Sequence, residues 1–379
     1  MTTRRGIRLP VTLACGLAAA AVPSARAGDT TTGYVLNYYS DVDGVSVFTH
    51  YLDVGLDPWR DVAVLLHYVH DTVIIPGIDA RPGSPEAVDA ITTASRPIAT
   101  ESEAYEDFVK QRDALQGGVT WKNTGLSYYV SSESDYFAQM VTLSYARDFL
   151  GDNLNLAAGL SYSWDEIRPL ADADTEGSGD HRRTLHGNLV ATCVLTPRTI
   201  ARLGAEFNRV EGQQHDPYRN VYAGGTNVSE NHPRERLRRD LFARLSRYLG
   251  NRSSLVGDLR WYGDDWGVSS QTWGLRLHQY VSDEVVVRYR YRFYNQGAAD
   301  FHRETYATTA GVDGHLTGDY RLGSFNAHLF GAQVAWRPRR APLLGGTVRA
   351  PELMVSYERY FNSNNFTANV FETGVQVSF

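Results

Sequence analysis

The sequence predicts an all-β fold: a closed antiparallel transmembrane β-barrel of about sixteen strands (roughly 14–18), with short periplasmic turns and long extracellular loops. Three observations lead to this prediction. Apolar and polar side chains alternate along strand-length segments, and the long connections between these segments fall on one side. Beyond the amino-terminal segment, no apolar run reaches the length of about 18 residues that a transmembrane helix needs.

The amino-terminal segment has the pattern of a secretory signal peptide. Three arginines precede the apolar stretch Leu9–Val22, and Ala25-Arg26-Ala27 supplies the small residues of a cleavage site. The apolar stretch is too short to span a membrane. We therefore expect residues 1–27 to be removed and residues 28–379 to form one outer-membrane barrel.

Composition excludes several other classes of protein. The full chain carries a net charge of -6, and removal of a signal with four arginines and no acid leaves -10. An acidic chain of this kind is not expected to bind nucleic acid. Cys193 is the sole cysteine after cleavage, so no intrachain disulfide can form. The 23 tyrosines and 7 tryptophans suit the aromatic girdles of membrane barrels.

The strands are identified by alternation of side chains between two faces. In one example, Val287, Tyr289 and Tyr291 alternate with arginines, which are hard to bury in the core of a soluble sandwich. The same reasoning along the chain gives sixteen strands. They are 33–41, 43–56, 60–74, 107–121, 123–133, 135–149, 153–166, 181–195, 199–211, 235–249, 253–264, 267–280, 284–296, 325–337, 350–361 and 366–379.

The connections support a membrane barrel with a defined orientation. If the chain starts in the periplasm, connections after odd strands lie outside the cell. The four longest such connections are Ile75–Glu106, Asp165–Asp180, Gly212–Arg234 and Gly297–Ser324. Connections after even strands are short turns, with the exception of Pro338–Arg349. A soluble barrel or sandwich with disordered loops is the alternative to this interpretation.

The last strand has the pattern of a barrel-closing segment. Its outward face is predicted to carry Phe371, Thr373, Val375, Val377 and Phe379, and its inward face to carry polar or small residues. Phe371, Val375, Val377 and the terminal Phe379 therefore form a candidate signal for the machinery that assembles outer-membrane barrels. An edge strand of a soluble sandwich is the alternative.

Arginines form the main candidate functional feature. Four consecutive predicted strands place basic side chains on the inward face: Arg236, Arg238, Arg244, Arg260, Arg276, His278, Arg288, Arg290 and Arg292. We name this set the arginine wall. Two predicted outer loops are acidic, so a field across a pore is expected to orient solutes and select ions. Alternatively, these arginines pair with carboxylates and fill a closed barrel.

Two stretches resemble an uncharacterised, porin-like family of Gram-negative outer-membrane β-barrel proteins, catalogued as a domain of unknown function. They are Asn37–Val45, and Ala87–Pro97 followed by Phe108–Arg112. The similarity extends from about Tyr34 over most of the mature chain. It implies a barrel in the bacterial outer membrane and no established activity, so no functional residue is carried over.

The function predicted from these features is passive passage of small hydrophilic solutes, with anions among the candidate solutes. A plugged barrel with a structural, assembly or export role is the second hypothesis. The third is a hydrolase at the outer rim, for which His215 and Asp216 are the candidates, although no nucleophile and base share a diagnostic spacing. We expect no enzyme activity, cofactor or metal. The expected partners are outer-membrane lipid, lipopolysaccharide, the assembly machinery and further copies of the chain.

Overall fold

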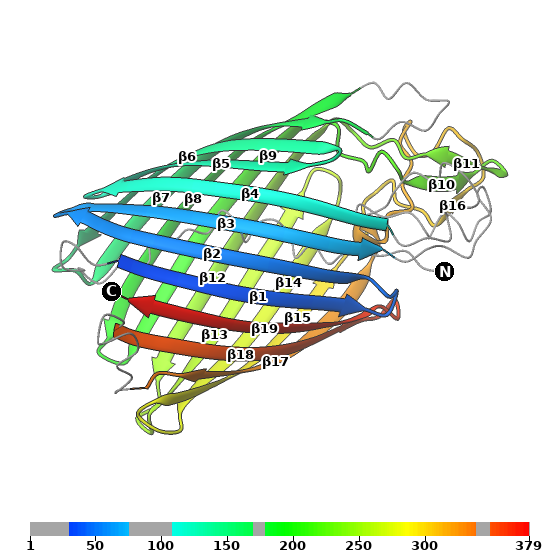
Figure 1. Cartoon of the computed structure of the whole chain (residues 1–379). Coiled ribbons are helices and arrows are strands. Elements are labelled where there is room, and N and C mark those ends of the chain that lie inside the picture. Colours follow the sequence, from blue (N-terminus) through cyan, green and yellow to red (C-terminus); the bar gives the residue numbers. More distant parts are fainter. Residues whose placement is uncertain (1–29, 76–107, 170–178, 339–348, 379) are drawn as a thin grey trace.

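The computed structural model describes residues 30–75, 108–169, 179–338 and 349–378 (Figure 1). The predicted signal peptide, the predicted loop Ala87–Pro97 and the terminal Phe379 lie outside the described residues. So do the acidic loop residues Glu101, Glu103, Glu106, Asp107, Asp172, Asp174 and Glu176. Among the described residues, no helix combines the length and the hydropathy required to cross a membrane.

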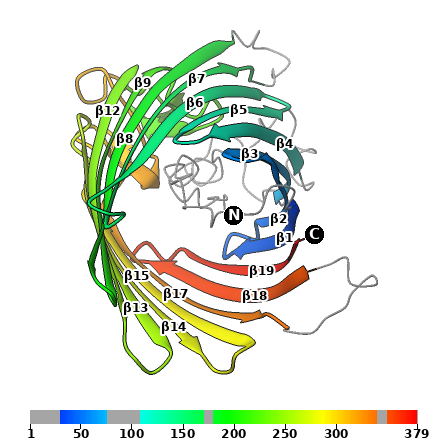
Figure 2. The same ribbon diagram turned by 90° about the vertical axis from the view of Figure 1, so that its left-hand side faces the viewer.

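Sixteen strands close into one antiparallel barrel (Figure 2). They are β1 Thr30–Asp41, β2 Ser46–Trp59, β3 Val62–Ile75, β4 Phe108–Trp121, β5 Thr124–Glu133, β6 Tyr136–Phe149, β7 Leu154–Ile167, β8 Asp180–Thr196, β9 Thr199–Gly212, β12 Glu235–Tyr248, β13 Ser253–Asp264, β14 Ser269–Tyr280, β15 Val285–Gln296, β17 Phe325–Trp336, β18 Arg349–Asn362 and β19 Thr367–Ser378. The sixteen predicted strands all correspond to these, which confirms the fold class.

The last strand closes the barrel as its pattern predicts. β19 pairs with β1, with Tyr34 opposite Val375 and Tyr38 opposite Phe371. Phe371 and Val375 are 48% and 38% exposed and face outward, whereas Glu372 lies on the opposite, interior face. Because closure pairs the first and last strands, the barrel presents no free sheet edge to hydrocarbon.

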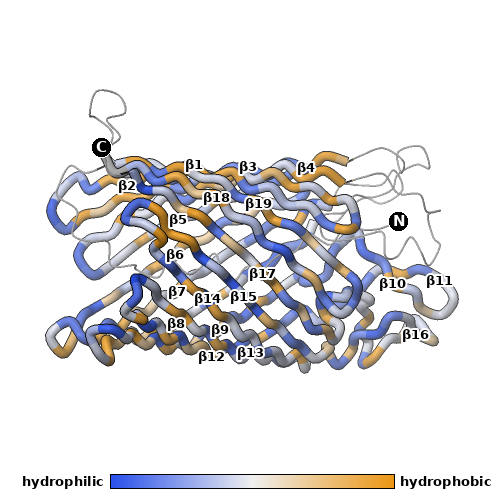
Figure 3. Tube along the Cα trace, turned by 90° about the horizontal axis from the view of Figure 1, so that it is seen from below, coloured by the Kyte–Doolittle hydropathy of each residue, from blue (hydrophilic) through white to orange (hydrophobic). Residues whose placement is uncertain are grey.

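Alternation separates an apolar exterior from a charged interior. Along the strands, hydrophobic and hydrophilic residues follow one another in turn (Figure 3). The exterior is made of large apolar side chains such as Leu203, Leu241 and Val355, each about 60% exposed. Water would strongly disfavour so much apolar surface, and hydrocarbon stabilises it. This architecture places the chain in a bacterial outer membrane.

The short turns at the periplasmic end depend on left-handed backbone conformations. The β12–β13 turn, for example, contains Gly250 with φ 87°, a conformation that glycine adopts without steric cost. The connection between β17 and β18 leaves and re-enters the barrel at this same end, as predicted, although residues 339–348 lie outside the described part of the chain.

Three short hairpins at the extracellular end share one local structure. In each, a side-chain oxygen accepts backbone N–H groups two and four residues further along the chain. The acceptors are Asp41, Asp264 and Asn362. The fourth residue of each hairpin has a positive φ, and the fifth is buried. Each polar side chain thus satisfies turn N–H groups that would otherwise lack a partner.

Two long extracellular loops fold together into a small domain, which we name the cap (residues 213–234 and 297–324). Strand β10 Asn220–Ala223 pairs antiparallel with β11 Thr226–Ser229 and parallel with β16 Thr305–Tyr306. Figure 1 shows this sheet beyond the extracellular end of the barrel. These three strands are not among those predicted from the sequence. They are short, and their partners are distant in sequence.

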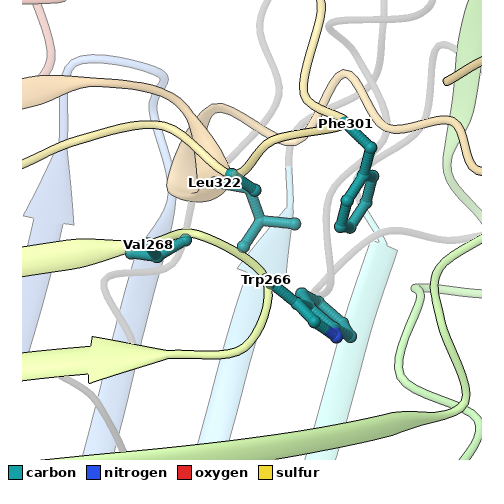
Figure 4. Close-up of a cluster of buried hydrophobic side chains, with 5 residues drawn as sticks. Trp266, Val268, Phe301 and Leu322 are labelled. Atoms are coloured by element: carbon teal, nitrogen blue, oxygen red, sulfur yellow. The ribbon is translucent and has the colours of Figure 1, made fainter.

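Apolar side chains attach the cap to the barrel. Trp266 and Val268 from the β13–β14 hairpin pack against Phe301 and Leu322 of the cap, together with Ala299 (Figure 4). The Trp266 indole N–H also donates to the Glu235 carbonyl at 2.9 Å. A second cluster, Val221, Ala223, Tyr306 and Leu316, lies inside the cap itself. The cap is therefore a packed element with its own core.

Candidate functional site

The arginine wall lies on the interior face of four adjacent strands. Strands β12, β13, β14 and β15 are consecutive neighbours in the barrel. Their outward positions carry Leu241, Trp261, Trp273 and Tyr289, which are 44–60% exposed. The arginines occupy the alternate positions, so they point inward. The structure thus places the nine predicted residues together on one side of the interior.

Five of the arginines form ion pairs with carboxylates. Arg244 and Arg276 share Asp258, with Arg276 at 2.9 Å. Arg260 lies 2.8 Å from both Glu206 and Asp240. The other two pairs are Arg236 with Asp264 and Arg290 with Glu358. Arg236 also stacks on the Trp266 ring, 4.2 Å from its centroid. For these five, the alternative prediction of internal pairing is correct.

Three arginines of the wall have no carboxylate partner among the described residues: Arg238, Arg288 and Arg292. On β15 the contrast is direct, because Arg290 pairs with Glu358 at 2.8 Å while Arg288 and Arg292, two residues to either side, do not. The Arg288 Nε donates to His278 Nδ1 at 3.4 Å, which supplies no negative charge. The wall therefore keeps a positive excess.

Arg202 on β9 extends the wall and was missed by the sequence analysis. It faces inward, opposite Arg244 in the β9–β12 register, with its guanidinium 5.8 Å from the Phe242 ring centroid. It too has no carboxylate partner in the part of the chain that the structure describes. The signal was available, because Arg202 alternates in phase with Gly204 and Glu206, which also face inward.

The opposite part of the interior has its own balanced groups. Lys110 lies 2.8 Å from Glu133 and 2.7 Å from Asp135, and Arg112 pairs with Asp71. His67 contacts Asp53 at 2.6 Å on the inner face, whereas His70 contacts Asp113 at 2.9 Å on the outer face. These two histidines point to opposite faces of the strand, so they cannot chelate one ion together.

The cap contains a buried ionic network. Glu230, with no exposed side-chain surface, lies 3.4 Å from Arg219 and 3.3 Å from His232. Its Oε1 accepts from Thr317 Oγ1 at 3.0 Å and from the Gly318 amide at 2.9 Å. Arg219 also lies 3.4 Å from Asp319. Since Glu230 and Thr317 come from different loops, the network ties the two loops together.

Burial within the cap shifts the pKa values of two groups near this network. Burial raises the pKa of Asp216 to about 6, although its Oδ1 accepts the Tyr218 amide at 3.0 Å. Burial also lowers the pKa of His215, and the neighbouring His232 lowers it further. The cap also contacts the connection between β5 and β6, because the Tyr218 hydroxyl donates to Asp135 at 2.9 Å.

The candidate rim residues His215 and Asp216 both lie in the cap. The described neighbours of His215 are Gln213 at 3.4 Å and the ring of His232, with 5.9 Å between centroids. In the residues that the structure describes, no hydrogen bond links His215 to Asp216 or to a hydroxyl nucleophile. Nor do three His, Cys, Asp or Glu side chains gather there to hold a metal ion.

Comparison with known proteins identifies a family but no activity. The model of a family described as "Protein of unknown function (DUF3570)" matches residues 16–347 of this chain. No functionally curated protein matches the sequence.

Several solved outer-membrane proteins resemble the chain. The siderophore receptor PirA from Pseudomonas aeruginosa is 10% identical with a TM-score of 0.44, covering 89% of this chain and 57% of that one. The outer membrane protein opdK from the same species is 10% identical with a TM-score of 0.44, covering 93% and 98%. A loop-deletion mutant of OmpT, an outer membrane protein of Vibrio cholerae, is 9% identical with a TM-score of 0.43, covering 92% and 98%. The chain spans little more than half of the siderophore receptor. At these TM-scores the likenesses carry no information on function.

Proposed function

This chain belongs to the DUF3570 family, whose function is unknown, and we propose that it is a porin-like channel for small hydrophilic solutes with a preference for anions. The observation that carries the proposal is the set of uncompensated interior arginines: Arg202, Arg238, Arg288 and Arg292. Barrels of this size are wide enough for an aqueous channel unless loops or side chains fill them.

The uncompensated arginines account for the direction of the preference. A guanidinium with a carboxylate partner presents little net charge to a passing ion. An unpaired guanidinium attracts a monovalent anion at about 4 Å by roughly 1 kcal/mol in a water-like medium, and by roughly 4 kcal/mol at an effective dielectric constant of about 20. The unpaired groups lie at different depths, from Arg288 near the periplasmic start of β15 to Arg238 near the extracellular start of β12. An anion can therefore pass from one weak site to the next, as conduction requires.

Paired and unpaired arginines on one strand allow a sharp test in planar lipid bilayers. The variant Arg288→Gln with Arg292→Gln removes two uncompensated charges. We expect the anion-to-cation permeability ratio to fall about tenfold, since each 1.4 kcal/mol corresponds to a factor of ten. The matched control, Arg290→Gln with Glu358→Gln, removes a neutral pair at the same level and should leave the ratio unchanged.

Two results would contradict the proposal. Equal reversal potentials for the wild type and the Arg288/Arg292 variant would show that these charges do not face the permeation path. Absence of stepwise conductance from correctly folded protein would favour the second hypothesis, a plugged barrel with a structural or export role. The folded cap is the observation that favours that role, because it presents a packed extracellular surface to a partner.

A further inference from the structure

The exterior wall carries an apolar depression across strands β14, β15, β17 and β18. Its volume is about 430 Å³. Two rows of register partners line it. The row nearer the periplasm is Leu277, Tyr289, Ala332 and Tyr357. The row nearer the cell exterior is Leu275, Tyr291, Phe330 and Arg359.

The depression exists because Ala332 is small. Ala332 lies directly between Tyr289 on β15 and Tyr357 on β18, which are 55% and 41% exposed. Directly opposed residues on one face of a sheet are only about 4.5–5.5 Å apart at Cβ. Two rings therefore form walls on either side of a methyl group, and their apolar surface faces the hydrocarbon of the membrane.

A polar group closes the extracellular end of this depression. The Asn369 side-chain oxygen accepts from the Tyr357 hydroxyl at 2.9 Å and from Arg359 Nη1 at 2.8 Å. Arg359 has no carboxylate partner among the described residues, and it lies three residues before the end of β18 at Asn362. An arginine on the lipid face is disfavoured in hydrocarbon and tolerated near the interface. Its remaining N–H donors need an acceptor there.

We propose that the depression binds a lipopolysaccharide molecule of the outer leaflet, with one acyl chain beside Ala332 and a phosphate group on Arg359. One ligand then supplies both an acceptor for Arg359 and an apolar partner for the two rings. A guanidinium binds phosphate through a fork of donors, and the rings pack against hydrocarbon. A second copy of this chain fits less well. It would remove Arg359 from water, and its own depression offers no carboxylate in return.

The test measures lipid retained by the intact protein, so it does not depend on conductance. The protein is extracted from outer membranes in mild detergent, and lipopolysaccharide per chain is counted by native mass spectrometry. Ala332→Phe fills the depression, and Arg359→Gln removes the charge while keeping a hydrogen-bonding group. Each variant should retain roughly tenfold less lipopolysaccharide, because a charge-assisted contact or a packed chain is lost.

Matched controls are available on the outer surface of two other strands, β9 and β12. Ala205→Phe enlarges another outward alanine, and Arg239→Gln neutralises another outward arginine near the extracellular end. Both should retain lipopolysaccharide at the wild-type level. If Ala332→Phe does not fold, the lipopolysaccharide retained by Arg359→Gln, compared with that retained by Arg239→Gln, still tests the proposal. Equal losses in variants and controls would overturn the proposal. So would retention of phospholipid alone, or an oligomer that Ala332→Phe disrupts.

Discussion

The buried ionic network of the cap gives a quantitative prediction about local stability. Glu230→Gln keeps the size of the side chain and an oxygen that can accept from Thr317 and Gly318. It removes the negative charge 3.4 Å from the buried Arg219. Breaking a buried ion pair by removing one partner typically costs about 3–5 kcal/mol, because the remaining charge is left uncompensated. Asp319, also 3.4 Å from Arg219, offsets part of this cost, so we expect about 3 kcal/mol.

Hydrogen exchange measures this change directly. A cost of about 3 kcal/mol corresponds to roughly a hundredfold more frequent opening of the cap. The reporters are the amides of Gly224, Asn231 and Gly318, which hold the two loops together. Barrel amides should not change, because the cap lies outside the strand ladder.

Glu235→Gln is the control for this measurement. Glu235 is 72% exposed and lies 3.5 Å from Arg209. Exposed pairs contribute only about 0–1 kcal/mol, so exchange in the cap should change little. The reasoning is refuted if Glu230→Gln leaves exchange in the cap unchanged, or if the two variants accelerate it equally.

Three further predictions test other features. The raised pKa of Asp216, about 6, means that its charged form destabilises the cap fully above pH 6 and not at all below the ordinary carboxyl range near pH 4. Asp216→Asn should therefore slow cap exchange at pH 7.5, with the difference from wild type disappearing by about pH 4. Val355 is 62% exposed at the middle of β18, so Val355→Arg should lower the folding stability by about 2–4 kcal/mol and reduce the folded fraction on heat-modifiability gels. The adjacent Ser356→Arg faces the interior and should be tolerated, and equal effects of the two variants would contradict the assigned faces. Trp266→Ala should cost about 3–5 kcal/mol locally and accelerate exchange in the cap, and unchanged exchange would show that the cap does not depend on this contact.

Much of the arginine wall could be predicted from the alternation of side chains. Once a strand is placed between lipid and interior, every second residue is assigned to a face, and this logic located Arg288, Arg290 and Arg292 correctly. Alternation does not reveal which of them is neutralised. Glu358, the partner of Arg290, is 68 residues away and reaches it from β18 across the intervening strand β17.

The cap could not be predicted in the same way. Its strands have two to four residues, and two of them pair in parallel across more than 80 residues of sequence. Such short segments carry no period that distinguishes a strand from a loop. The charges of Arg219, Glu230 and Asp319 resemble those of a solvated loop. Their burial became apparent only in the folded structure.

The sequence by itself determined the barrel, its orientation and the inward face of each strand, because the contrast between hydrocarbon and water acts on every residue locally. Tertiary structure alone decided which interior charges remain uncompensated, how the two outer loops pair, and where Ala332 leaves a depression in the wall. These features depend on contacts between strands and loops distant in sequence, and the pattern within one segment does not encode them.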